Sequence, residues 1–498
     1  MPRWRTFRDT LASGELSSTA IKNSAAIEGT EFLEARERGW QENRTLPFAL
    51  DLVSAASVLG ATAAATEAAR FVLEQGGSAS GAAQSIARTL LGINPPPPAP
   101  QRQDRIQIIS GIKTLKARRI SQPKNAFVWM DLARLYVTLG QIDAAQETLR
   151  VARALAPTER FVLRSTTRFL LHAQKPDEAL RLLRSNARTP SDPWLMAAEI
   201  AVSSVLGKPS KCAANGQKFL AHGDTPPLHR SELTCALAGM EMEHGKDKRA
   251  IRLFTQSLED PTDNALAQVV WASNQLRIGQ VNAKLLAIPY ASEALTFDAF
   301  NQGRWNDVLV EADAWIKDES FSARPRLLAS SIAVSLLDEA SLGEQIAREG
   351  LATNPGHPGL VNNVAFALVR QGQPRQALKF LERAITARMT PVQAICLLAT
   401  TGLVHYRLGM NTEGRDFYEK AIKAAENHRQ DQLEIVATLY FAKERVISGD
   451  IEGAKQFGRT YERAKKHPSP NVPAIAERLK KDVDEACSKA NVSKPGSA

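Results

Sequence analysis

Small and large apolar residues recur at helical spacing along most of the chain, and one arrangement of them repeats. The arrangement is clearest at residues 125–157, NAFVWMDLARLYVTLGQIDAAQETLRVARALAP. Two helical stretches, one before and one after Gly140, carry large residues and alanines at fixed places. A period of about 34 residues predicts a stack of helix pairs, because a single pair cannot bury its own apolar face.

Further units with this pattern follow along the chain. They begin near Arg160, Ser231, Ala323, Pro358, Ile395 and Ile435. Small residues let the two helices of a pair approach closely, and large residues fill the gaps between them. The pattern is weaker over residues 192–223 and 264–317, where we expect helices without a clear repeat register.

The repeated unit resembles the tetratricopeptide repeat, in which small and large residues alternate in this way along two antiparallel helices. The resemblance covers residues 125–467. It implies an all-α fold, a right-handed superhelical solenoid of antiparallel helix pairs with a separate N-terminal helical module. It also implies a protein-interaction role, because this repeat serves many partners.

Proline and charge patterns suggest where this array begins and ends. Residues 1–94 read as an N-terminal helical module of unknown family, and residues 95–124 as a proline-rich hinge and a basic helical segment. The hinge contains four consecutive prolines in the run NPPPPAP, which cannot lie inside a helix. Residues 468–498 are expected to form a charged capping helix and a disordered tail, since a solenoid end needs a polar cap.

Composition narrows the function classes. The 498 residues are 44% hydrophobic and carry a net charge of +10, spread over 63 basic and 53 acidic side chains. The four cysteines include no C-x-x-C pair, so neither zinc nor another cofactor is expected, and a reducing compartment fits best. With no apolar leader and no stretch long enough to span a bilayer, a cytoplasmic location is expected.

We find no catalytic motif in the sequence. Phosphate-binding loops, dinucleotide fingerprints, zinc-protease and serine-hydrolase signatures are all missing. Cys396 and His405 lie on one predicted helix but about 13 Å apart along its axis, too far for a nucleophile–base pair. The chain is therefore predicted not to be an enzyme.

The inner face of the solenoid is the predicted binding surface. In this repeat family the first helix of each pair lines the concavity, and the residues placed there combine amide, aromatic and basic side chains. They are Arg134, Asn362, Asn363, Phe366, Arg370, Tyr406, Arg407 and Lys443. Such groups can pair with a peptide backbone, anchor its apolar side chains and bind carboxylates. The family's clamp for a C-terminal carboxylate is absent, because Cys396 and Thr400 occupy two of its cationic positions.

These observations predict a non-enzymatic scaffold or adaptor that holds a protein or peptide in the concave groove. An alternative is a nucleic-acid-associated regulator or defence-system component that uses the basic segment 102–124. That segment holds seven cations and one acid but no aromatic residue before Phe127, so base stacking is not evident. A third reading, an unfamiliar enzyme site within residues 1–94, has no motif in its favour.

Overall fold

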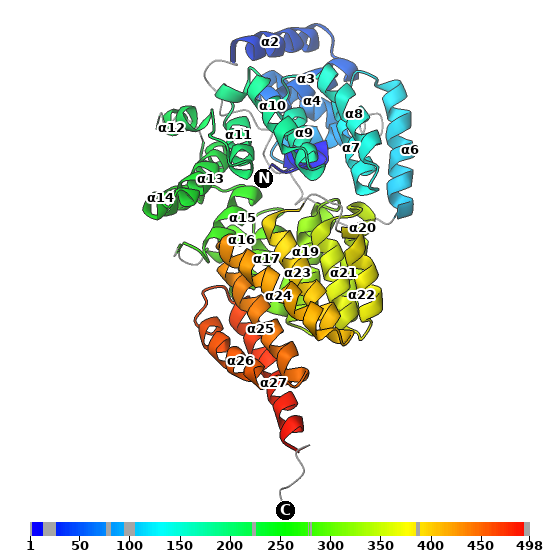
Figure 1. Cartoon of the computed structure of the whole chain (residues 1–498). Helices are drawn as coiled ribbons and strands as arrows, with labels where there is room; N and C mark the ends of the chain where they lie inside the picture. Colours follow the sequence, from blue (N-terminus) through cyan, green and yellow to red (C-terminus); the bar gives the residue numbers. More distant parts are fainter. Residues whose placement is uncertain are drawn as a thin grey trace, which may run out of the picture. The chain divides into compact units, whose positions relative to one another are not determined.

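A computed structural model gives the arrangement of the chain. It describes residues 2–12, 26–75, 81–93, 105–221, 226–276, 278, 281–384 and 389–492. Every regular element in these ranges is a helix, so the predicted all-α solenoid is confirmed (Figure 1). The chain forms two compact units: unit 1 is Met1–Ala294 with Lys317–Glu319, and unit 2 is Leu295–Ile316 with Ser320–Ala498.

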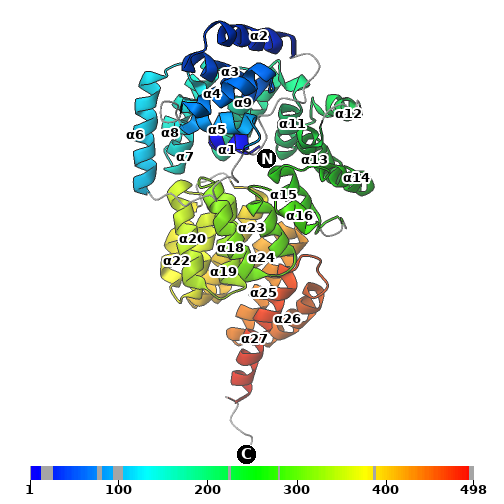
Figure 2. The same ribbon diagram turned by 180° about the vertical axis from the view of Figure 1, so that it is seen from behind.

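Unit 1 begins with a short segment without regular secondary structure and a group of helices that pack on one another, and it continues with helix pairs. Its helices are α1 (Phe7–Ala12), α2 (Ala26–Glu42), α3 (Leu46–Leu59), α4 (Ala63–Glu74), α5 (Gly81–Leu90), α6 (Arg105–Ser121), α7 (Ala126–Thr138), α8 (Ile142–Leu155), α9 (Arg160–His172), α10 (Pro176–Ser185), α11 (Pro193–Val205), α12 (Ala213–Ala221), α13 (Pro227–Glu243), α14 (Asp247–Ser257), α15 (Asp263–Ala272) and α16 (Ala283–Leu286), with a 3-10 turn at Thr189–Ser191. Helices α2 to α5 contact one another, and α1 contacts both α5 and α7 (Figure 2).

The first helix pair of unit 1 shows why the repeat folds as it does. Asn125 caps α7 by accepting a hydrogen bond from the Phe127 amide, at 3.1 Å. Gly140 then takes a φ of 73°, a conformation that glycine adopts without strain, and turns the chain into α8. Ala133 and Ala145 are fully buried, which allows the two helices to lie close together.

Unit 2 is a second succession of helix pairs. Helices α17 (Ser292–Asn301) and α18 (Trp305–Asp318) contribute most of their residues to it. The others are α19 (Ala323–Ser335), α20 (Ala340–Thr353), α21 (Pro358–Arg370), α22 (Pro374–Ala384), α23 (Pro391–Arg407), α24 (Asn411–Asn427), α25 (Asp431–Ile447), α26 (Ile451–Ala464) and α27 (Asn471–Val492).

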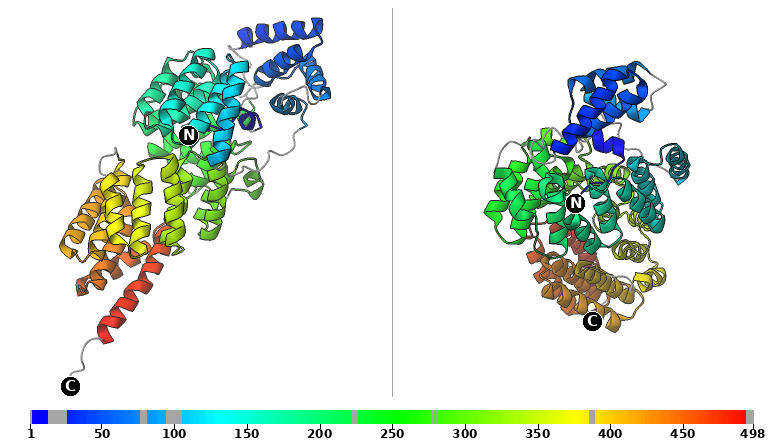
Figure 3. Two further views of the ribbon diagram at one scale, coloured as in Figure 1. Left: turned by 90° about the vertical axis from the view of Figure 1, so that its right-hand side faces the viewer. Right: turned by 90° about the horizontal axis from the view of Figure 1, so that it is seen from above.

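The first helices of the pairs in unit 2 form one layer. Each of α19, α21, α23 and α25 packs against the next, and each also packs against the second helix of its own pair (Figure 1). Their buried leucines, valines and tyrosines make a single core cluster. The long final helix α27 lies against α25 and α26 (Figure 3, red beside orange).

Most helix positions follow the sequence pattern. Helices begin at Ala126, Arg160, Ala323 and Pro358, as predicted. The helices predicted near Ser231, Ile395 and Ile435 begin four residues earlier, because helix-compatible residues precede the first repeat position. The weak stretch 192–223 folds as the pair α11 and α12.

The domain organisation differs from the prediction in two ways. The division between the units lies inside the predicted array, near residue 294, where the repeat pattern weakens. Residues 2–7, predicted to belong to the separate N-terminal module, instead pack among the array helices of unit 1, where acidic side chains bind Arg3 and Arg5. The proline run and the predicted tail at 493–498 lie outside the described residues.

A glycine contact between α23 and α24 gives a test of this packing. A Cβ atom at Gly402 would lie 2.7 Å from the Tyr418 ring and 3.0 Å from the Gly414 carbonyl. We expect Gly402→Val to lower the free energy of unfolding by about 2 kcal/mol, because neither neighbour can yield without moving a helix. Urea unfolding of the purified chain measures this change.

Gly458 is the matched control, because a Cβ atom there would meet no atom within 4 Å. Gly458→Ala should raise the free energy of unfolding by up to about 1 kcal/mol through helix propensity alone. Equal losses in the two variants would contradict the proposed close contact of α23 with α24.

Candidate functional site

Two cavities lie side by side on the inner surface of unit 2. The first, which we call the polar cavity, has a volume of about 840 Å³ and is bordered by α21, α23, α25 and α27. The second, the apolar cavity, has a volume of about 520 Å³ and adds residues of α17, α18 and α19. Leu403 and Tyr440 line both cavities, so the two are neighbours.

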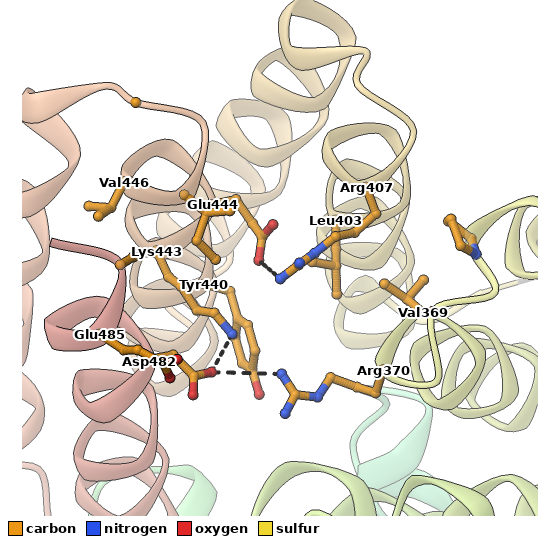
Figure 4. Close-up of a pocket in the computed structure, with 15 residues that line it drawn as sticks. Val369, Arg370, Leu403, Arg407, Tyr440, Lys443, Glu444, Val446, Asp482 and Glu485 are labelled. Atoms are coloured by element: carbon orange, nitrogen blue, oxygen red, sulfur yellow. Dashed lines mark hydrogen bonds and ion pairs between the residues drawn. The ribbon is translucent and has the colours of Figure 1, made fainter. Parts of the chain in front are cut away.

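Ion pairs cross the polar cavity between neighbouring helices. Arg407 of α23 donates to Glu444 of α25 at 2.8 Å, and Lys443 of α25 donates to Asp482 of α27 at 2.5 Å. Arg370 of α21 reaches the same Asp482 carboxylate at 3.8 Å. Figure 4 shows these side chains pointing toward one another from opposite walls. The pairs tie four consecutive inner helices together.

Burial makes the charges of the polar cavity sensitive to their partners. The pKa of Glu444 is raised because the carboxyl is buried, although the charges of Arg407 and Lys443 partly offset this effect. Burial also lowers the pKa of Lys443, against the opposing effect of its hydrogen bond to Asp482. Cations and acids are paired one with another, so the cavity offers no excess of either sign to a strongly charged ligand.

The apolar cavity is walled by aromatic rings. Phe297, Phe300 and Trp315 come from the hairpin α17–α18, and Phe366 comes from α21. Phe366 meets the ring of Tyr440 edge to face, with 5.7 Å between centroids. This space matches a bulky apolar side chain, because small-molecule and peptide anchors bind in concave, largely apolar pockets of this size.

Three buried polar atoms along the two cavities have no hydrogen-bond partner among the described residues. They are the Asn362 side-chain oxygen, the Tyr440 hydroxyl and the Arg370 Nε–H. The Asn362 and Tyr440 side chains belong to residues that are 9% and 8% exposed. An unmade hydrogen bond at such a site costs about 1–3 kcal/mol. The residues that line the two cavities therefore offer an acceptor, a hydroxyl and a donor that are not used within the described part of the chain.

The final helix completes the wall of the cavities. Arg478 of α27 donates to the carbonyls of Val334 and Ser335, at 2.9 and 2.6 Å, which are the last carbonyls of α19. It also binds Asp338, which accepts from Arg370 at 2.8 Å. A cation at a helix C-terminus is favourable, because the last carbonyls have no partner within the helix. Helix α27 is thus an inner wall as well as a cap.

The structure brings most of the predicted groove residues to this surface. Asn362, Asn363 and Phe366 line the apolar cavity, and Arg370, Arg407 and Lys443 line the polar cavity. Asn363 uses its amide within the fold, donating to Leu327 O and Ser330 Oγ at 3.1 and 2.8 Å.

Two predicted residues lie elsewhere. Tyr406 lines neither cavity; it is buried against Tyr418 and Phe441, because its helix turns that face toward α24. Arg134 belongs to unit 1, where it donates to the carbonyls of Trp4 and Asp318 at 3.2 and 3.0 Å. Neither residue is therefore available to a ligand of the unit 2 surface.

Sequence reasoning missed Tyr440, Arg478 and the aromatic residues of α17 and α18. Tyr440 occupies an inner position of α25 one turn before Lys443, so the same helical spacing could have found it. Arg478 and Trp315 gave no such signal, because they reach the surface from a predicted cap and from a stretch with no clear repeat register.

The other chemical candidates have ordinary structural roles. Burial raises the pKa of Cys396 to about 11, which keeps it a thiol, and His405 Nδ1 contacts the Thr401 carbonyl of its own helix at 2.8 Å. Within the described residues, no cluster of histidine, cysteine and acidic side chains suits a metal ion. The described helices also include none that is both long and apolar enough to cross a membrane.

The basic segment contributes helix α6, whose residues Ile108 and Ile112 pack on Leu132. Arg119 lies over the Trp129 ring, 5.0 Å from its centroid. Residues 101–104 lie outside the described part of the chain. Nucleic-acid binding by this segment stays a prediction.

Comparison with known proteins agrees with the repeat pattern. Residues 128–158 match the tetratricopeptide repeat family. No curated protein matches the sequence. Similar solved structures include human IFIT1, as a dimer with m7Gppp-AAAA, at 12% identity and a TM-score of 0.39 over 78% of this chain and 97% of that chain.

Two further similar structures are the Cut9–Hcn1 hetero-tetramer of the APC/C and yeast Tom70. The first has 11% identity and a TM-score of 0.44, covering 97% of this chain and 96% of that chain. The second has 13% identity and a TM-score of 0.35, covering 93% and 98%. With TM-scores below 0.5, these similarities carry no argument about what this chain binds.

Residues 128–158 match the tetratricopeptide repeat family, and they lie within a longer succession of stacked helix hairpins. Repeats of this family support a role as a protein-interaction scaffold.

The ion pair between the exposed Arg407 and the buried Glu444 gives a test of the polar cavity. Glu444 is 2% exposed, so Arg407→Met leaves its buried carboxylate without the cation that donates a hydrogen bond to it. We expect a loss of about 3 kcal/mol in the free energy of unfolding at pH 8, measured by urea titration. Arg415→Met, which removes a more exposed pair with Asp450, should cost less than about 1 kcal/mol.

The loss in Arg407→Met should also depend on pH in a defined direction. A carboxyl whose pKa is raised by folding favours the folded state below its unfolded pKa, and this contribution is lost as pH rises through the folded pKa. Removing Arg407 raises the pKa of Glu444 further, so the penalty should be smaller at pH 5 than at pH 8. A penalty independent of pH would contradict a buried, unpaired Glu444.

Proposed function

We propose that this protein is a scaffold that binds an extended peptide segment of a protein partner along the inner surface of unit 2. The observation that carries the proposal is the set of buried polar atoms on Asn362, Tyr440 and Arg370 that have no hydrogen-bond partner among the described residues. An extended peptide presents an N–H donor and a carbonyl acceptor at every residue. Its backbone can therefore supply a donor to Asn362 and an acceptor to Arg370.

The apolar cavity sets the side-chain chemistry of the bound segment. Four aromatic side chains, Phe297, Phe300, Trp315 and Phe366, enclose the space next to Asn362. A large aliphatic or aromatic residue of the partner would fill it and exclude water from the hydrogen bonds beside it. Buried anchors of this kind dominate the energy of most protein interfaces.

The polar cavity restricts the rest of the peptide. Its cations are paired with Glu444 and Asp482, so a free C-terminal carboxylate has no uncompensated cation to bind. We therefore propose an internal segment of the partner with a bulky apolar residue and few charges. The pre-formed walls reduce the ordering cost of binding.

Tyr440→Phe is the sharpest test of this proposal. The hydroxyl has no partner among the described residues, so its removal should leave the free energy of unfolding unchanged or slightly higher. Peptides selected from a random displayed library on the intact chain should nevertheless bind the variant about tenfold more weakly, because one hydrogen bond to the peptide is lost. Fluorescence anisotropy gives the affinities, and urea unfolding gives the stability.

Two further variants, Phe366→Ala and Tyr461→Phe, test the apolar cavity and provide a control. Phe366→Ala removes part of the anchor wall and should weaken the same peptides by about 30-fold or more. Tyr461 lies outside both cavities, and its hydroxyl donates to Glu477. Tyr461→Phe should therefore leave the affinity for the peptides unchanged. Selected peptides that bind all variants equally would exclude the inner surface of unit 2 as their site.

The cysteines are relevant to where such a scaffold works. All four are free thiols, and burial raises the pKa of Cys212 to about 12. Unpaired cysteines are typical of a reducing compartment, and we propose the cytoplasm.

A further inference from the structure

The first residues of the chain lie on the inner surface of unit 1, where they are held as a bound peptide would be. We call residues 2–7 the N-terminal segment. Residues 2–6 have no regular secondary structure, and Phe7 begins α1. Arg3, Trp4 and Arg5 are 4%, 0% and 1% exposed, values typical of a protein core. This site is independent of the unit 2 surface.

Four carboxylates surround the two arginines of the segment. Arg5 makes two hydrogen bonds to Asp318, at 2.8 and 2.7 Å, and two to Asp263, at 3.3 and 2.7 Å. Arg3 donates to Asp263 at 3.0 Å and also pairs with Glu293, while Glu319 lies 3.5 Å from it. Asp263, Glu293, Asp318 and Glu319, which we call the acidic cage, are all nearly inaccessible to solvent.

The guanidinium group suits this cage better than an ammonium group does. Its planar fork can bind two carboxylates side by side, as Arg5 does with Asp263 and Asp318. The face of the Arg5 guanidinium also lies 4.3 Å from the centroid of the Tyr290 ring. Burial alone would raise the pKa of Asp263, but Arg5 and Arg3 hold this pKa below its ordinary value.

Aromatic contacts alternate with the charged ones along the segment. The Trp4 ring meets Phe169 of α9 edge to face, and Phe7 stacks on Phe127 of α7 with 3.8 Å between centroids. Trp4 thus contacts an aromatic ring, while Arg3 and Arg5 on either side of it contact the acidic cage.

The array also binds the backbone of the segment. Arg134 of α7 donates to the Trp4 carbonyl at 3.2 Å, and Asp131 accepts from the Phe7 amide at 3.0 Å. Side chains of α7, α9 and α15 thus recognise the segment through its backbone, its aromatic rings and its charges. Removing the segment would take two guanidiniums away from four buried carboxylates, a strongly unfavourable change.

We propose that the inner surface of unit 1 is a binding site for basic peptides of the Arg–aromatic–Arg type, and that the N-terminal segment is its tethered occupant. A partner peptide with the same chemistry displaces the segment. A tethered ligand acts at a high local concentration, so the segment competes strongly with an external peptide. The peptide therefore has a low affinity for the intact chain and a higher affinity for a chain that has lost the segment.

The test places a protease site within residues 13–25 of the full chain, so that unit 1 folds before the segment is cut. After cleavage, a fluorescent peptide of residues 2–12 is added and its anisotropy followed. We expect it to bind the cleaved chain at least about 100-fold more tightly than the intact chain. Peptide with Arg5→Lys should bind about 30-fold more weakly, and a scrambled peptide of equal charge should not bind.

A matched pair of variants tests the cage itself. Asp263→Asn should weaken peptide binding by about 30-fold or more, because it removes a carboxylate that contacts both arginines. Asp177→Asn is the control, since its side chain is 63% exposed and pairs with Lys208. Equal affinity in the two variants would show that the peptide binds elsewhere.

Other outcomes also decide the question. A cut segment that stays bound through gel filtration but exchanges with excess labelled peptide supports the proposal. A cut segment that neither dissociates nor exchanges, or a unit 1 that unfolds even with peptide in excess, shows that residues 2–7 are core rather than ligand. A folded, segment-free chain that binds neither the native nor the scrambled peptide overturns the proposal as well.

Discussion

The close approach of the two helices in each pair is the constraint on which the rest of the structure depends. At α23 and α24 the contact is made by Gly402 and Gly414, each of which faces a tyrosine ring of the other helix. At α7 and α8 it is made by buried alanines such as Ala133 and Ala145. Because the two helices of each pair lie close together at these points, the first helices of successive pairs can form one layer. This layer provides the inner surface of each unit.

Both ends of the chain contribute to an inner surface. In unit 1 the N-terminal segment lies among α7, α9 and α15, with Arg3 and Arg5 in the acidic cage. In unit 2 the final helix α27 lies against α25 and caps α19 through Arg478. A solenoid leaves its concave face without a second layer, so segments at its ends are the natural means of covering it.

The two inner surfaces differ in what they leave unsatisfied. In unit 1 the four carboxylates of the acidic cage pair with Arg3 and Arg5 of the N-terminal segment and, at Glu319, with Arg168 of α9. In unit 2 the charges are paired across the polar cavity, while the Asn362 oxygen and the Tyr440 hydroxyl lack partners among the described residues. Buried polar groups are normally hydrogen-bonded, so these atoms of the unit 2 surface are candidate contacts for a further partner.

The sequence alone determined the helix pairs, because small and large residues at fixed spacing encode them locally. It also placed Asn362, Phe366, Arg370, Arg407 and Lys443 on one face, since helical periodicity alone assigns a face. Only the tertiary structure decided that Arg134 and Tyr406 are taken up by the fold, that Trp315 lines the apolar cavity, and that Arg478 caps α19. Contacts such as Arg5 with Asp318 span 313 residues, and no local pattern encodes a pairing of that range.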